Sequence, residues 1–272
     1  MTALDPLTAE ASGSISVSRL RRSRHWVGAA LPVGIVILWQ IVSMSGAVNP
    51  LFMPSPADVG SSFVEVISSG QLANDMAISL WRAVQGFVIG GGSGVVAGIV
   101  LGLVPWAGKL LDPTLQLIRL TPTLAIAPLL VLWFGFDETS KVVLIATIAF
   151  FPLYLSALQG IRHVDAQLRE VAAVLGFSWT DRARLLTVPS SLPYLFNGLR
   201  LSLAGSWLGL IVAELTGADN GIGHLILAGQ TQSRTDQVFV GIIVFAEMGW
   251  AIDRSVRAVE QRALHWRTAD SR

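Results

Sequence analysis

The chain has 272 residues, of which 52% are hydrophobic and only 14% are charged, and its formal net charge is +1. A soluble domain usually carries about 25% charged residues, so this composition argues against a water-soluble globular protein and predicts several membrane spans. The absence of cysteine excludes disulfides, zinc–thiolate sites and iron–sulfur clusters.

The N-terminal segment is polar and ends in the basic cluster Arg19, Arg21, Arg22 and Arg24. We interpret residues 1–25 as a disordered cytoplasmic tail. A cleavable signal peptide is the alternative, but the apolar run that follows is longer than a usual signal core and lacks a good cleavage site. Residues 26–79 should hold the first span and an outer segment in which Ser55 could cap a short amphipathic helix. That helix could lie on the membrane surface or pack on the bundle.

Six segments are apolar and long enough to cross a bilayer, since a span needs about 20 mostly apolar residues. With the N-terminus inside, Lys and Arg gather in the cytoplasmic segments, and the outer loops hold only Lys141 and Arg234. The sequence therefore predicts an all-α membrane protein with six transmembrane helices and both termini cytoplasmic. Five spans form a core over residues 80–257, followed by a basic cytoplasmic tail over residues 258–272. The six spans are expected at residues 26–45, 80–104, 113–134, 141–160, 195–216 and 236–256.

The second span carries a glycine at every fourth position. Glycines four apart form a groove on one helix face that lets another helix approach closely. This pattern predicts tight helix packing and does not indicate a ligand. The glycines are Gly86, Gly90, Gly94, Gly98 and Gly102.

The third span contains Pro122 and Pro128, which should kink it. Kinked, partly polar spans often line transport paths, so Arg119 and Thr121 are candidate path residues. Arg119 lies near the expected cytoplasmic end, where its side chain could instead extend to the membrane interface.

Two carboxylates lie within the last two spans. Glu247 is near the middle of the sixth span, where a charge should face the bundle interior or a water-filled path. It is either a path residue or one half of an interior pair. Glu214 lies near the outer end of the fifth span, where solvation at the interface would explain it.

Several catalytic patterns are missing. There is no G-x-x-x-x-G-K-[ST] phosphate loop, so the chain is not expected to bind ATP in that way. The four histidines fall in separate loops without metal-site spacing, and no nucleophile–base arrangement is present. We predict no enzyme activity, no catalytic residue, no metal site and no nucleic-acid partner.

The loop between the fourth and fifth spans is predicted to be cytoplasmic and to contain two short helices. Apolar spacing predicts the first helix over Val164–Leu175, and Gly176 is its expected left-handed cap. Ser178 and Asp181 have the spacing of a capping box for a second helix, which Pro189 should stop after about residue 187. Such an element could lie on the membrane surface or dock onto a soluble partner.

This loop resembles the EAA loop of ABC-importer permeases, whose pattern is E-A-A-x-x-x-G-x9-I-x-L-P. Glu170, Ala172, Gly176 and Pro189 match it without a gap, and Val171, Leu186 and Val188 depart from it with apolar residues. Further stretches, including "MPSPADV", "VLWFGFDETSKV" and "LIVAELTGADNGIGHLI", look like the aliphatic sulfonate permease branch, which includes taurine and nitrate permeases. The likeness spans roughly residues 28–260.

The resemblance implies a homodimeric permease subunit of an ATP-driven importer in the bacterial inner membrane, surrounded by the lipid bilayer. Its partners would be two ATP-binding subunits, which hold ATP-Mg, and an extracytoplasmic substrate-binding protein; the chain itself would bind no cofactor. The substrate would be an aliphatic sulfonate or a related anion such as taurine or nitrate, for which Arg119 and Arg200 are candidate cationic contacts. The alternative is a secondary transporter or channel with Glu247 as an ion relay. The implied ATPase-coupling residues are Glu170, Ala172, Ala173, Gly176, Leu186 and Pro189.

Overall fold

The computed structural model describes the backbone of residues 17–264 and side chains from residue 30 to residue 264. This part of the chain contains helices and no strand. It divides into an N-terminal unit, Met1–Asp58, and a main unit, Val59–Arg272. The helices are α1 (Val17–Met44), α2 (Pro56–Ser68), α3 (Gln71–Leu103), α4 (Pro105–Leu120), η1 (Thr123–Ile126), α5 (Ala127–Phe134), α6 (Glu138–Arg162), α7 (Ala166–Val174), α8 (Trp179–Arg182), η2 (Ala183–Thr187), α9 (Val188–Leu215), α10 (Ile222–Thr231) and α11 (Thr235–Ala263).

In the N-terminal unit, α1 starts at Val17, so the helix begins earlier than the boundary expected at residue 26. Residues 1–16 of the expected tail, and residues 265–272 of the basic tail, lie outside the described residues. Ser55 caps α2 as predicted: its Oγ accepts from the Asp58 backbone N at 3.2 Å, and Asp58 Oδ2 accepts from the Ser55 backbone N at 3.1 Å.

The part of α2 that belongs to the main unit packs on that unit. Val59 and Val66 are buried, while Val64 and Ile67 stay exposed. Arg234 Nη2 donates to Glu65 Oε2 at 2.7 Å, and this hydrogen bond and charge lower the pKa of Glu65 below its ordinary value. The contacts favour the bundle-packed interpretation of this segment, although its apolar outer side also remains available to the membrane surface.

Four helices of the main unit are long and apolar enough to span a membrane: α3, α6, the continuous helix Trp179–Leu215, and α11. A fifth candidate is the pair α4 and η1–α5, which bends by 78°. The apolar part of α1 with described side chains, Ala30–Met44, is shorter than a full span. The count of six spans and the orientation of the termini therefore stay predictions.

The third predicted span is broken, not merely kinked. Thr121 adopts an extended backbone (φ −68°, ψ 129°) because it precedes Pro122, whose ring disfavours a helical residue before it. Pro128 falls in the first turn of α5, where its missing N–H costs nothing, so it starts a helix and does not kink one. The helix before the break also starts at Pro105, earlier than the predicted residue 113.

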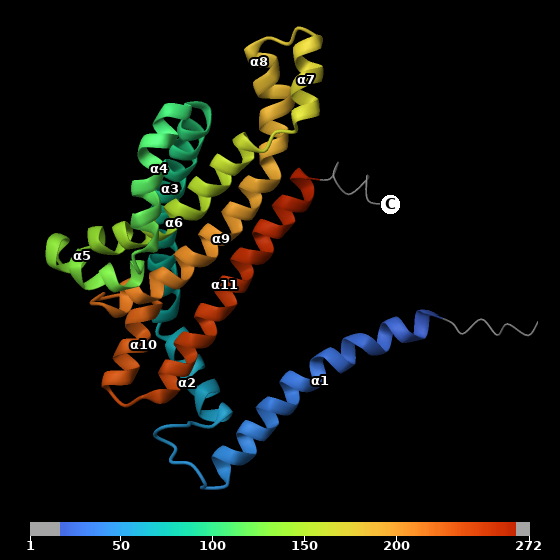
Figure 1. Ribbon diagram of the computed structural model, residues 1–272. Coiled ribbons are helices and arrows are strands. Elements are labelled where there is room, and N and C mark those ends of the chain that lie inside the picture. Colours follow the sequence, from blue (N-terminus) through green and yellow to red (C-terminus); the bar gives the residue numbers. More distant parts are fainter. Residues whose placement is uncertain (1–16, 265–272) are drawn as a thin grey trace, which may run out of the picture. The chain divides into compact units, whose positions relative to one another are not determined.

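The core of the main unit is built around α6, which packs along both α3 and α9 (Figure 1). Ile145 and Ala149 of α6 and Leu210 of α9 are completely buried. The glycine stripe of α3 faces α6: a β-carbon on Gly86 would lie 2.5 Å from the Ile145 side chain, and one on Gly98 would lie 2.5 Å from the Tyr154 carbonyl oxygen. The helices approach this closely because the stripe has no side chains.

We expect Gly90→Ala to lower the free energy of unfolding by about 1–3 kcal/mol, because its new methyl group would overlap the Ala146 backbone of α6 and force the helices apart. Gly92→Ala is the matched control on the same helix, since no atom lies within 4 Å of its β-carbon. Unfolding by SDS in mixed micelles, followed by circular dichroism, measures both. Equal stability of the two variants would contradict the close contact at Gly90.

Candidate functional site

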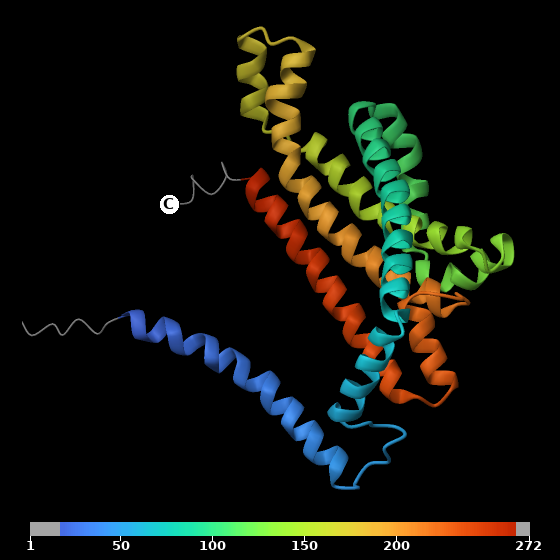
Figure 2. The same cartoon turned by 180° about the vertical axis from the view of Figure 1, so that it is seen from behind.

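The loop between α6 and α9 forms a helical hairpin, α7 and α8, that extends beyond the end of the bundle (Figures 1 and 2). Asp165 caps α7 by accepting from the Gln167 backbone N at 2.8 Å. The helix is one to two residues shorter at each end than the predicted Val164–Leu175.

Gly176 ends α7 in the left-handed conformation, with φ +68°, as predicted. Its N–H donates to the Ala173 carbonyl oxygen at 3.2 Å, and the Phe177 N–H donates to the Ala172 carbonyl oxygen at 3.0 Å. These two bonds form a complete Schellman motif. The chain therefore reverses direction at a defined angle, which sets how α8 lies against α7.

The predicted capping box opens α8. Ser178 Oγ accepts from the Asp181 backbone N at 3.2 Å, and Asp181 Oδ2 accepts from the Ser178 backbone N at 3.2 Å. This geometry confirms the local prediction for the start of the second helix.

The prediction that Pro189 stops this second helix is wrong. The chain passes from α8 through the π-helical turn η2 directly into α9. The Val188 N–H donates to the Ala183 carbonyl oxygen, five residues back, so the hydrogen-bond register already changes where Pro189 arrives. Pro189 then lies in the first turn of α9, where a proline is tolerated. The hairpin is therefore joined to a long core helix without a loop.

The hairpin exposes apolar side chains together with a carboxylate. Val174 is 87% exposed, Leu175 and Val171 are also exposed, and Glu170 is exposed beside them. Of the other residues implied by the resemblance, Ala172 is buried, Ala173 is exposed, and Leu186 and Pro189 are half-buried. An apolar face that the chain's own core does not cover is available for contact with a partner or a membrane.

The candidate path residues lie on exposed surfaces of the main unit. Arg119 is in the last turn of α4 and Thr121 is at the helix break, and both are exposed. Glu247 is exposed on α11, not turned into the interior of this chain, and within residues 30–264 no ion pair joins it to Arg119. In a membrane, a charged side chain and a broken helix at such positions require water or another protein surface.

The structure contains a buried polar cluster that was not predicted from the sequence. Glu214 is completely buried, so the expected interfacial solvation of this residue is wrong. Its Oε1 accepts from Arg82 Nη1 at 2.9 Å and from Ser79 Oγ at 2.7 Å. Arg82 also makes a bidentate pair with Glu138, with both N–O distances 2.6 Å.

The same cluster fixes the loop between α9 and α10. The backbone N–H groups of Gly221, Ile222 and Gly223 donate to Asp75 Oδ1, Ser79 Oγ and Glu214 Oε2 at 2.8–2.9 Å. A sequence signal for this cluster did exist. Asp75, Ser79 and Arg82 lie at helical spacing on one face of α3, and they continue the glycine stripe toward the helix N-terminus.

The family model and the similar proteins that this chain matches all belong to one class, the membrane components of transport systems. Residues 94–265 match the family model described as "Binding-protein-dependent transport system inner membrane component". The chain is 42% identical to a Bacillus subtilis (strain 168) protein described as an aliphatic sulfonates transport permease, over 97% of this chain and 99% of that one. A protein of the same description from Escherichia coli (strain K12) is 41% identical, over 88% and 91% of the two chains. The taurine transport system permease protein of E. coli is 32% identical, over 85% and 86%.

Proposed function

Because this chain belongs to the family of binding-protein-dependent transport system inner membrane components, in the sulfonate and taurine branch of the ABC-importer permeases, we propose that it couples the import of aliphatic sulfonates to a separate ATPase. The chain is a multi-pass protein of the bacterial inner membrane. In our proposal, two copies form the path and two ATP-binding subunits, carrying ATP-Mg, dock on them. A substrate-binding protein delivers the anion, an aliphatic sulfonate or a close relative such as taurine, from outside.

The observation that carries this proposal is the hairpin α7–α8. It offers an exposed apolar face and Glu170 beyond the end of the bundle, which suits docking of a helix into a groove of a soluble partner. Its second helix is continuous with α9, so a displacement of the docked hairpin would move a core helix directly. Coupling of ATP binding to the path requires such an element with two positions.

The path itself is proposed to run where the exposed break of α4 and η1–α5 meets the second copy. The break leaves Arg119 and Thr121 exposed, and an anionic substrate would be attracted to the guanidinium group. A broken helix at membrane depth needs protein or water around it, which a dimer interface with a central path would supply.

We expect Glu170→Lys to reduce the ATP-binding subunit that co-purifies with this chain by about tenfold, because reversing a charge inside a docking face costs several times the thermal energy. Affinity purification from cells that express all subunits measures this, and uptake of a radiolabelled alkanesulfonate should fall in parallel.

The matched control is Arg169→Glu, a charge reversal on the neighbouring residue, which points about 100° away around α7. It should leave assembly near the wild-type level. If Glu170→Lys assembles and transports normally, the docking role of this face is wrong; if both variants fail equally, the loss is not specific to the face.

A further inference from the structure

An apolar groove runs along the main unit between α3 and α9, with α6 as its floor. It consists of two adjoining cavities of about 260 and 430 Å³, which share Leu195 of α9 as a lining residue. The α3 wall is formed by four side chains and one glycine at every fourth position, which make one continuous ridge inclined to the helix axis. These residues are Phe87, Gly91, Val95, Ile99 and Leu103.

The groove is at least as long as one membrane leaflet. At 1.5 Å per residue, its lining rises about 17 Å along α9, from Val188 to Leu199, and about 24 Å along α3, from Phe87 to Leu103. The hydrocarbon core of a bilayer is about 30 Å thick, so one leaflet is about 15 Å. A single extended acyl chain would therefore fit the groove along its length.

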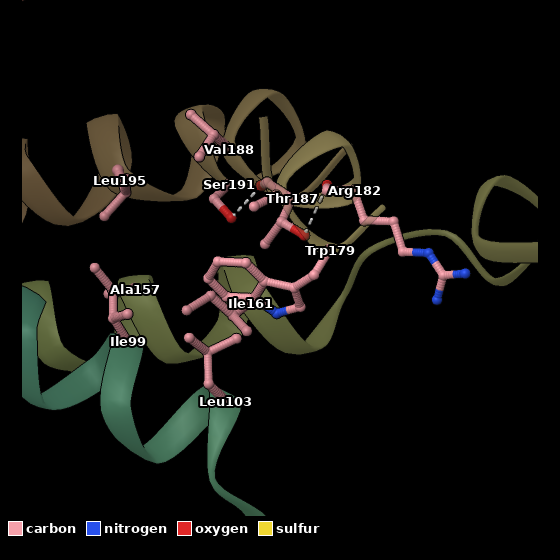
Figure 3. A pocket seen from close by; sticks show the side chains of 11 residues that line it. Ile99, Leu103, Ala157, Ile161, Trp179, Arg182, Thr187, Val188, Ser191 and Leu195 are labelled. Carbon is pink, nitrogen blue, oxygen red and sulfur yellow. Dashed lines mark hydrogen bonds between the residues drawn. The ribbon is translucent and has the colours of Figure 1, made fainter. Parts of the chain in front are cut away.

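One end of the groove is aromatic and cationic. Figure 3 shows the indole of Trp179 beside Ile161 at this end, while the guanidinium of Arg182 extends away from the apolar residues. Arg182 Nε donates to the Phe177 carbonyl oxygen at 3.1 Å, which orients the guanidinium group, and the residue as a whole is exposed. Among residues 30–264, no acidic side chain pairs with it.

We propose that this groove binds an anionic phospholipid, with one acyl chain between α3 and α9 and the phosphate on Arg182. The apolar lining favours a lipid acyl chain, and the exposed guanidinium group at one end favours a negatively charged headgroup. The bound lipid packs under Trp179 and the π-helical turn, so it stabilises the junction of the hairpin with α9. The proposal concerns this chain alone and does not depend on docking of an ATPase.

The test uses fluorescence of the purified full-length chain in nanodiscs of phosphatidylcholine. A small fraction of the host is replaced by phosphatidylglycerol brominated on its acyl chains, or by equally brominated phosphatidylcholine. Bromine quenches nearby tryptophans, and subtracting the signal of Trp179→Phe isolates Trp179. We expect the brominated anionic lipid to quench Trp179 at a fraction about fivefold lower than the zwitterionic lipid, the preference that one arginine near a membrane surface provides.

Three further variants make the outcome specific. Arg182→Gln should abolish the preference, whereas Arg184→Gln, the same charge change on a residue that does not line the groove, should keep it. Ala183→Leu should fill the groove and reduce quenching by both lipids. Equal quenching by the two lipids, or a preference that survives Arg182→Gln, would overturn the proposal. Absence of quenching by either lipid would also overturn it and would indicate that a protein segment or a second copy covers the groove.

Discussion

Replacing Arg82 with leucine is expected to lower the free energy of unfolding by about 3–5 kcal/mol, because it leaves the Glu214 carboxylate buried without a cation. The loss should be larger than for any single substitution on the hairpin. The loop from Gly217 to Gly223 should become mobile as well, since Arg82 Nη1 also donates to the Asn220 carbonyl oxygen at 2.6 Å. Unfolding in detergent micelles measures the stability, and hydrogen exchange of the loop amides measures the mobility.

Two controls separate the buried pair from the exposed one. Glu138→Gln removes only the partner whose side chain is 60% exposed, so it should cost at most about 1 kcal/mol. The double variant Arg82→Leu/Glu214→Leu removes both buried charges and should regain much of the stability lost by the single change. If Arg82→Leu alone were as stable as the wild type, the buried pair of Arg82 and Glu214 would contribute nothing to the free energy of unfolding.

For Gly176→Val, we expect transport to fall about tenfold while the chain still inserts and folds. A β-carbon at this position meets no atom within 4 Å, so the cost is one of backbone conformation and not of space. A side chain in the left-handed region costs about 1–2 kcal/mol, and a β-branched one costs more, which lowers the population of the correctly turned hairpin. Uptake of a radiolabelled alkanesulfonate and co-purification of the ATP-binding subunit measure the effect.

Gly176→Asn is the matched control for this prediction. Asparagine tolerates the left-handed conformation better than other residues with side chains, so this variant should keep most of the transport. Normal transport by Gly176→Val would mean that the angle between α7 and α8 is not important for coupling. Equal losses in both variants would point to the side chain itself, not to the backbone.

Features that depend on neighbours in the sequence were predicted correctly. The left-handed Gly176 and the Ser178–Asp181 capping box each involve residues within a single turn, so residue types and spacing are sufficient to specify them. The tight packing of α3 against a neighbouring helix was also predictable, because glycine at every fourth position leaves one side of a helix without side chains. The residues proposed for coupling and for the path stay predictions.

Features that depend on distant partners were not predicted. Glu214 is separated from Arg82 by 132 residues, and a hydropathy pattern cannot distinguish a carboxylate at the interface from one paired inside the bundle. The effect of proline was predicted wrongly at two places, and in opposite directions: it was underestimated at Pro122 and overestimated at Pro189. Pro122 breaks its span completely, while Pro189 is accommodated after a π-helical turn, and the sequence alone does not show which neighbours absorb the lost hydrogen bond.

The uninterrupted helix from Trp179 to Leu215 has a mechanical consequence. Its 37 residues correspond to about 55 Å, which exceeds the thickness of a bilayer with its headgroups, about 40–45 Å. One end is the second helix of the hairpin, and the other end carries Glu214, which accepts a hydrogen bond from the loop before α10. A rotation or tilt of this single rod would therefore reach both surfaces of the membrane at once, so events on opposite sides could be synchronised without a chain of separate rearrangements.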